Sequence, residues 1–144
     1  MRQLSDGEIV EVLTGNRIGV LALNGDQFPY PLPVSFGYDP DADLLVFQLE
    51  GDDDTRKRRC LDRDDAVGLT VYEETEPERR WRSVVVSGRL VETSYEAAES
   101  ALATLARSAQ SVPNPVTWSD ASTVTPFELR IEDWSGRAFD VGGP

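Results

Sequence analysis

The feature that most constrains this chain is a series of short strand-like segments with few helices between them. Five such segments, rich in Val, Leu, Phe and Tyr, span residues 17–24, 28–38, 44–50, 66–73 and 81–93. A last strand is expected over 127–140, which a turn at Ser135-Gly136 could divide into a hairpin. Sequential strands with short connections favour a small, mainly β, antiparallel barrel over a parallel sheet.

The residue types within these segments predict how each strand is buried. Segment 17–24 is expected to be a buried strand, and the run Val84-Val85-Val86 indicates burial on both faces of segment 81–93. Segment 28–38 contains three prolines in its first half. Proline lacks the N–H that a central ladder needs, so that half should lie at an edge or form a bulged entry.

Three helices are expected around these strands. Residues 5–15 begin with the capping-box pattern Ser5 to Glu8, carry apolar residues at helical spacing, and end at Gly15. Residues 55–63 form a short helix with Thr55 as its cap, and 95–109 form an amphipathic helix capped by Ser94. The stretch 111–126, which contains Trp118, is expected to be an ordered loop. No linker interrupts the chain, so residues 1–144 are predicted to form a single domain.

The acidic composition narrows the functional classes. The 144 residues carry 26 Asp and Glu against 14 Lys and Arg, giving a net charge of −12, which opposes binding to nucleic acid or an anionic membrane. No apolar run reaches the length of a membrane-spanning helix, and the first residues lack a secretory signal, so a cytoplasmic protein is expected. One cysteine and no histidine exclude an internal disulfide, His-based catalysis and His-ligated metals.

The basic residues are almost all arginine, with Lys57 as the single lysine. An acid-rich, lysine-poor composition that retains arginine resembles that of proteins from salt-accumulating haloarchaea. Carboxylates hold hydration at high salt, and the salt screens their mutual repulsion. We therefore expect a halophilic protein, although an ordinary soluble acidic protein is the alternative.

The segment Thr55-Arg56-Lys57-Arg58-Arg59 places four consecutive cations in an otherwise acidic chain. Basic side chains, the Thr55 hydroxyl and helix N-terminal N–H groups together suit a phosphate monoester. On a helix, Arg56 and Arg59 share a face and Lys57 points elsewhere, so the cations cannot all hold one group. The alternative is a solvated helix face, neutralised by neighbouring acidic residues: Asp52, Asp53, Asp54, Asp62 and Asp64.

Two strand segments and one thiol are further candidates. Residues 32–37 mix Pro, Ser, Phe and Gly, so irregular backbone amides and a hydroxyl beside an apolar wall could suit a flat heteroaromatic; an ordinary bulged edge strand is the alternative. Trp81 and Arg82 could cap a pocket or lie at a subunit contact. Cys60 lies near the arginines, but a buried structural thiol is favoured over a nucleophile.

The order of these segments resembles the FMN-binding split-barrel superfamily, and within it the small pyridoxamine 5′-phosphate oxidase-like proteins, including the nitroimidazole-resistance branch. The likeness covers roughly residues 5–107. Its most specific parts are Pro-Val-Ser-Phe at 33–36 and Arg-Ser-Val-Val-Val-Ser-Gly-Arg at 82–89. The resemblance implies a six-stranded antiparallel split barrel of Greek-key type and a homodimer with flavin mononucleotide (FMN) at the subunit interface.

The same resemblance implies a set of cofactor-binding residues. Val34, Ser35 and Phe36 would line the isoalloxazine, Phe47 and Gln48 would lie below it, Arg56 and Lys57 beside Thr55 would hold the phosphate, and Ser83 would reach the flavin from the long strand. Three departures from the family are visible. Gln48 stands where related proteins often have histidine. The loop 51–54 is triply acidic, and the C-terminal pattern of authentic pyridoxamine phosphate oxidases is absent, so vitamin B6 synthesis is not the expected activity.

The expected function is a flavin-dependent oxidoreductase acting on a small organic substrate, in which the flavin carries the redox chemistry. Three alternatives remain open from the sequence: a non-catalytic flavin-storage or flavin-sensing protein, a deazaflavin-dependent reductase, and a barrel that has lost its ligand. In the last case, side chains such as Phe47 or Trp118 would block the groove.

Overall fold

The computed structural model describes residues 1–50, 56–77, 79–94, 96 and 124–141. Its elements, in chain order, are β1 (Arg2–Gln3), α1 (Asp6–Gly15), β2 (Ile18–Leu23), β3 (Tyr30–Asp39), β4 (Leu44–Glu50), α2 (Arg56–Arg63), β5 (Ala66–Glu76), β6 (Arg80–Glu92) and β7 (Val124–Asp140). The acidic loop 51–54, Thr55 and, apart from residue 96, the expected helix 95–109 lie outside the described residues, as does all of the expected loop 111–126 except its last three residues.

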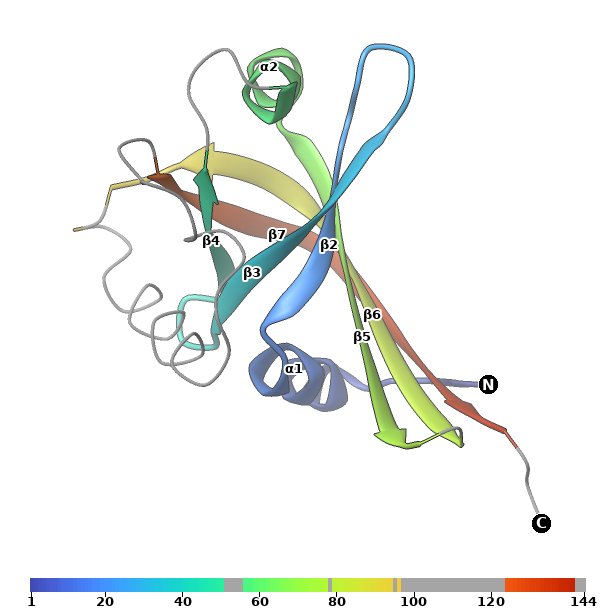
Figure 1. The fold of residues 1–144 in the computed structure, drawn as a ribbon. Helices are drawn as coiled ribbons and strands as arrows, with labels where there is room; N and C mark the ends of the chain where they lie inside the picture. Colours follow the sequence, from blue (N-terminus) through green and yellow to red (C-terminus); the bar gives the residue numbers. More distant parts are fainter. Residues whose placement is uncertain (51–55, 78, 95, 97–123, 142–144) are drawn as a thin grey trace.

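The strands close into a ring through β7. This strand pairs with β4 along one part of its length and with β6 along most of it, while the remaining neighbours follow the order β4-β3-β2-β5-β6. All pairings are antiparallel, and two-residue β1 adds to β7 outside the ring. The β4–β5 connection passes through α2 to the far side of β2, which gives the Greek-key crossing (Figure 1). The predicted six-stranded antiparallel barrel is therefore confirmed.

The prolines of β3 locate the place where this barrel is split. Residues 30–35 pair only with β2, and residues 36–39 pair with β4, so β3 parts from β4 at Phe36. Pro31 and Pro33 lie in the half with a single strand neighbour, where a missing N–H does not interrupt a central ladder. The predicted edge character of this half is confirmed, and α2 lies above the point where the two strands diverge (Figure 1).

Helix α1 closes one end of the barrel. The Ser5 hydroxyl accepts a hydrogen bond from the Glu8 N–H, and the Glu8 carboxylate accepts one from the Ser5 N–H, so the predicted capping box is present. The predicted apolar face, formed by Ile9, Val12 and Leu13, is buried in the core. The helix ends at Gly15, as expected.

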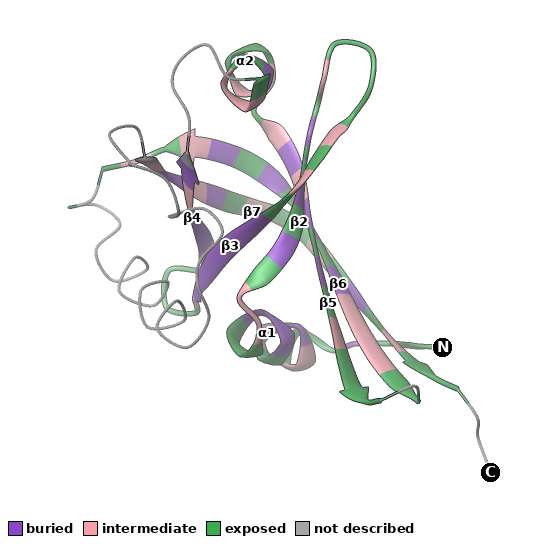
Figure 2. Ribbon diagram, in the orientation of Figure 1, coloured by how far each residue is buried: buried purple, intermediate pink, exposed green. Residues whose placement is uncertain are grey.

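Two strands that we expected to be buried, β2 and β6, alternate between buried and exposed residues. In β2, Leu21 and Leu23 are buried while Ile18 and Val20 are exposed; in β6, Val85 is likewise exposed between buried neighbours (Figure 2). The physical reason is that successive side chains point to opposite faces, and only one face of each strand meets the barrel interior. The prediction that Val84-Val85-Val86 is buried on both faces was wrong, and segment 17–24, expected to be a buried strand, is buried on one face only.

The C-terminal strand also differs from expectation. β7 runs without a turn from Val124 to Asp140, so Ser135-Gly136 forms no hairpin and residues 124–126 belong to a strand. Gly136 packs closely against α1 and the segment before it, because a Cβ there would lie 2.8 Å from the Leu4 Cδ1 atom and 3.1 Å from the Ile9 Cγ1 atom. A single long strand is required at this place because it must reach both β4 and β6. β5 likewise extends to Glu76, three residues beyond the predicted end.

Candidate functional site

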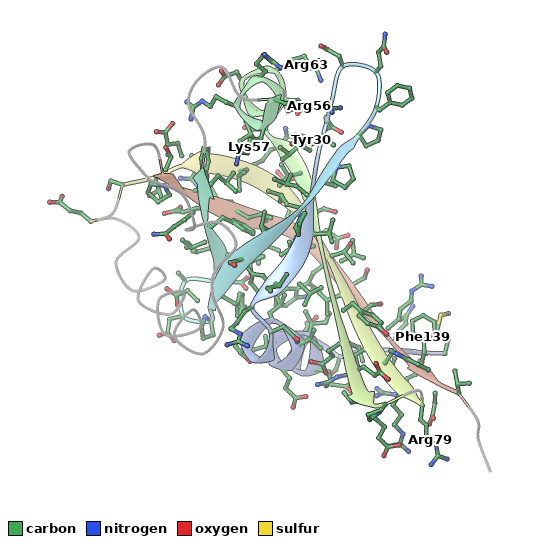
Figure 3. The ribbon with its side chains drawn as sticks, in the orientation of Figure 1. Tyr30, Arg56, Lys57, Arg63, Arg79 and Phe139 are labelled. Atoms are coloured by element: carbon green, nitrogen blue, oxygen red, sulfur yellow. The ribbon has the colours of Figure 1, made fainter. Side chains whose placement is uncertain are left out.

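The cations of α2 divide between the sides of the helix. Arg56, Arg59 and Arg63 share one face and line a pocket of about 520 Å³ between α2 and the loop that joins β2 to β3. We call this cavity the α2 pocket; its lining also includes Asp26, Gln27, Phe28 and the buried Cys60. Lys57 is not among the lining residues and lies on another side of the helix (Figure 3). The prediction that Arg56 and Lys57 point to different sides of the helix is thus confirmed.

Arg56 is the first residue of α2, and its guanidinium lies over the ring of Tyr30, the first residue of β3. The guanidinium carbon is 4.4 Å from the ring centroid, a cation–π contact (Figure 3). The side chain of Arg56 is exposed and that of Lys57 half-buried. Both belong to the first turn of the helix, so a phosphate above the helix N-terminus would be within reach of both.

The far end of the α2 pocket is tied together by Arg63. Its guanidinium donates a hydrogen bond of 2.7 Å to the Asn24 carbonyl and forms an ion pair with Asp26. The Asn24 side chain donates in turn to Asp64, 3.0 Å away. A hydrogen bond from the Ala66 N–H, followed by that from Asn24, lowers the pKa of Asp64. The loop and α2 therefore form one hydrogen-bonded unit.

Arg58 has a different environment from the cations of the α2 pocket. It forms ion pairs with Asp62 at 3.3 Å and with Glu92 of β6 at 3.0 Å, and its guanidinium lies 5.9 Å from the ring centroid of Phe127. These contacts attach α2 to the barrel, so the alternative of a neutralised, structural helix face describes Arg58 well.

The expected isoalloxazine residues on β3 and β4 lie side by side, but their side chains face different ways. Val34, Phe36 and Phe47 are fully buried in the core, with the two Phe ring centroids 6.5 Å apart. They can therefore offer a ligand only backbone groups. The β3–β4 pairing ends at Phe36 and Phe47, and Ser35 and Gln48 are the next residues on the two strands; Ser35 is also buried, whereas Gln48 is half-buried.

Ser83 lies apart from this group within one protomer. It pairs with Tyr72 on β5 and Arg137 on β7, and its side chain is half-buried on the outer face of the barrel. Between Ser83 and Ser35 lie two strands, β5 and β2, so with about 4.8 Å per strand they are roughly 14 Å apart. The structure therefore does not bring Ser83 into contact with Ser35 or with α2 inside a single chain.

An apolar patch that the sequence analysis missed occupies this outer face. Val20, Thr70 and Val85 are neighbours across β2, β5 and β6, and Ile18 and Tyr72 lie two residues further along the same face. Four of these side chains are large, apolar and exposed: Ile18 by 47%, Val20 by 45%, Tyr72 by 58% and Val85 by 45%. We call these five residues the outer patch. In the sequence these residues alternate with Leu and Val residues that are buried, and this alternation could have indicated a second, exposed apolar face.

The loop side of the α2 pocket was also missed. Phe28 is exposed by 70%, and nothing in the local sequence distinguishes it from a strand residue. Arg63 could have been found, because it stands seven residues after Arg56 and therefore on the same helical face.

A second cavity, of about 500 Å³, lies at the opposite end of the barrel beside Trp81 and Phe139. Its cations are held in ion pairs. Arg80 lies 3.5 Å from Asp140, and Arg82 donates to Glu73 at 2.6 Å and to Glu11 at 3.0 Å. Burial disfavours the charge of Arg82, but these hydrogen bonds outweigh it and raise its pKa. These ion pairs therefore stabilise this end of the β5–β6 hairpin.

Other chemistry is sparse in the described part of the chain. Cys60 is a free, buried cysteine. Within the described ranges, no group of three or more acidic or cysteine side chains is arranged to hold a metal ion, and no helix has the length and apolarity to cross a membrane. The expected blocking residue Phe47 points into the core, and Trp118 lies outside the described residues.

A closed six-stranded barrel, split beside β3 and bearing a cationic helix above the split, defines the class of split-barrel proteins. Residues 5–138 match the sequence profile of the pyridoxamine 5′-phosphate oxidase family, and the chain belongs to this family. No curated protein matches the sequence.

Solved structures agree with this assignment. A FAD-binding protein from Mesorhizobium loti shares 27% identity and a TM-score of 0.74, over 95% of this chain and 96% of that one. A candidate 5-nitroimidazole antibiotic resistance protein from Bacteroides thetaiotaomicron has 17% identity and a TM-score of 0.74, over 96% and 87% of the two chains. A FAD-binding protein from Mycobacterium smegmatis has 17% identity and a TM-score of 0.69, over 98% and 100%. The last two show a shared fold.

Proposed function

We propose that this protein binds FMN and acts as a flavin-dependent oxidoreductase on a small organic substrate. The observation that carries the proposal is the cationic first turn of α2, which stands above the split between β3 and β4 in a chain of net charge −12. Family membership and the 27% identical FAD-binding protein support a flavin as the ligand.

In this proposal the phosphate lies over the N-terminus of α2. Arg56 and Lys57 flank that N-terminus, and Thr55 precedes it in the sequence. Helix N–H groups and two cations together suit a dianion. The backbone of residues 34–36 and of Phe47 and the half-buried side chain of Gln48 would then meet the ring system, since the side chains of Val34, Ser35, Phe36 and Phe47 are buried.

We propose that the protein forms a homodimer with the flavin at the subunit interface. The outer patch supports this, because large apolar side chains gathered on one exposed sheet face are typical of contact surfaces. A second copy seated on this face would also give Ser83 a role, because Ser83 lies three strands from Ser35 and pairs with Tyr72 of the outer patch. Ser83 would then contact the flavin held mainly by the partner.

A bound flavin supplies the redox chemistry, taking up and releasing electrons as a hydride or singly. The chain's own residues bind and orient it. Arg56 and Lys57 would fix the phosphate end, the Gln48 side chain and the backbone at Ser35 would offer hydrogen bonds to the ring edge, and the buried core behind β3 would keep water from the inner side.

The test is reconstitution with FMN in molar KCl, followed by gel filtration and flavin absorbance. Because a hydrogen bond to a charged group contributes about 1.5–3 kcal/mol, Arg56→Ala and Lys57→Ala should each weaken FMN binding by roughly 10- to 150-fold. Arg79→Ala, an exposed arginine on the far β5–β6 turn, is the matched control and should change nothing (Figure 3). No retained flavin in the wild-type protein, or unchanged affinity in the double variant, would refute the assignment.

The same preparation separates an enzyme from a flavin-storage or flavin-sensing protein. Oxidation of a reduced nicotinamide donor by the reconstituted dimer would support turnover. Tight FMN binding without any oxidation or flavin-dependent reduction would favour the non-catalytic alternative.

A further inference from the structure

Arg56 is held by a different kind of partner from Arg58 and Arg63. Both of the latter form ion pairs with carboxylates. The Arg56 guanidinium lies over the ring of Tyr30 instead, with its central carbon 4.4 Å from the ring centroid (Figure 3). A carboxylate cancels the charge of the arginine it pairs with, whereas an aromatic ring attracts a cation and leaves its net charge in place. Tyr30 therefore holds Arg56 without neutralising it.

The ring and the guanidinium belong to elements that other contacts already attach to each other. Tyr30 is the first residue of β3, and the loop before it is joined to α2 by a 2.7 Å hydrogen bond from Arg63 to the Asn24 carbonyl. The other side of α2 is joined to β6 by the ion pair between Arg58 and Glu92, 3.0 Å apart. Because these attachments do not involve the Tyr30 ring, we expect α2 and β3 to stay in place without it. What the ring determines is the orientation of the guanidinium.

A guanidinium that is already oriented binds a phosphate more tightly than a mobile one. The arginine side chain loses rotamer freedom when a ligand fixes it, and part of this loss is avoided if a neighbour restricts the side chain beforehand. A ring that covers one face leaves the N–H donors at the edges of the guanidinium, where two of them match two phosphate oxygens. Arg56 is also the first residue of α2, and its side chain is exposed, so the donors lie where helix N–H groups favour an anion.

We propose that Tyr30 is a positioning residue that acts through Arg56 and sets the preference of the protein for a phosphorylated flavin over the same flavin without its phosphate. This inference rests on the flavin site proposed above. Tyr30 does not itself bind the phosphate. Its ring orients the guanidinium at the N-terminus of α2, and the guanidinium donates to the phosphate. The role therefore requires the aromatic face of Tyr30 and not its hydroxyl group.

The experiment measures the affinities for FMN and riboflavin in molar KCl by quenching of flavin fluorescence. Riboflavin carries the same ring system without the phosphate. Tyr30→Leu removes the aromatic face and keeps an apolar side chain at this half-buried position, whereas Tyr30→Phe keeps the face and removes only the hydroxyl. Phe139→Leu, at an exposed aromatic residue at the other end of the barrel, is the matched control (Figure 3). Circular dichroism verifies folding, and Tyr30→Met takes the place of Tyr30→Leu if that variant does not fold.

Tyr30→Leu should weaken FMN binding about two- to fivefold, which corresponds to the strength of an exposed cation–π contact, and should leave riboflavin binding unchanged. Tyr30→Phe and Phe139→Leu should retain the wild-type affinity for both flavins. In an Arg56→Ala background, Tyr30→Leu should cause no further loss, because the ring acts through the guanidinium.

Equal losses of FMN and riboflavin affinity in Tyr30→Leu would assign the ring a merely structural role and overturn the proposal. The same loss in Tyr30→Phe, or an undiminished loss in the Arg56→Ala background, would also overturn it. If Arg56→Ala weakens FMN binding and Tyr30→Leu does not, this proposal is wrong and the proposed function stands. Failure of the wild type to bind either flavin overturns both.

Discussion

Replacing Gly88 by alanine should weaken the seam between β6 and β7 that closes the barrel. A Cβ at Gly88 would lie 2.0 Å from the Arg130 carbonyl oxygen and 3.0 Å from the Leu129 Cδ2 atom, whereas ordinary contacts begin at 3.4 Å. The obstacle is backbone, and the register between these strands already shifts at Ser87/Gly88, so the strands must move apart by more than 1 Å. Overpacking costs about 1–3 kcal/mol and a lost ladder hydrogen bond about 1 kcal/mol, so the expected loss of unfolding free energy is about 2–4 kcal/mol.

The facing strand provides a matched control for this substitution. Gly68 lies on β5 beside the same part of β6, but a Cβ there would meet only the Val86 carbonyl oxygen, at 3.7 Å. Gly68→Ala should therefore be neutral, or stabilising by about 0.4–1 kcal/mol through the unfolded chain. Urea unfolding in molar KCl measures both variants. Free energies of unfolding for Gly88→Ala and Gly68→Ala that agree within about 0.5 kcal/mol would refute the role assigned to Gly88.

Two further predictions concern charge. The hydrogen bond from Arg2, followed by that from the Ser5 N–H, lowers the pKa of Glu8 from 4.5 to about 2, so its stabilising contribution is complete above pH 4.5 and lost as the pH falls to 2. The difference in unfolding free energy between wild type and Glu8→Gln should shrink over that window; a difference that grows on acidification would contradict this. Because the net charge is −12, the urea midpoint should rise from dilute buffer to molar KCl, and greater stability in dilute buffer would contradict the halophilic interpretation.

Features governed by local chemistry could be predicted from the sequence. The capping box at Ser5 and Glu8 and the strand Leu44–Glu50 lie where expected, because caps and turns depend on neighbouring residues. Prolines 31 and 33 likewise identified the half of β3 that has one neighbour. In each case the deciding contact lies within a few residues along the chain.

Features governed by distant contacts could not be predicted. Val85 looks like a core residue between Val84 and Val86, since an apolar run does not reveal whether its outer member faces solvent, a partner or the interior. Ser135-Gly136 has the composition of a turn, yet Gly136 lies in a continuous strand and packs closely against Leu4, far away in the sequence.

The candidate site has the same limitation. The i, i+7 spacing of Arg56 and Arg63 is visible in the sequence, but the opposite wall of the pocket comes from residues 26–28, on a hairpin formed by other strands. The identity of the opposite wall depends on the β4–β5 crossover, which carries α2 across the barrel to that hairpin. No local pattern in residues 24–28 indicates that contact.

The four consecutive cations allow both a phosphate site and a neutralised helix face, and the helix gives them different surroundings. Successive residues turn by about 100°, so a run of four must serve different surroundings. Arg58 meets Glu92 and Phe127 and attaches α2 to the barrel, whereas Arg56 and Arg59 face the hairpin loop. Because the same run both anchors the helix and presents cations beside it, a ligand held by Arg56 is held by a helix that Arg58 fixes in position.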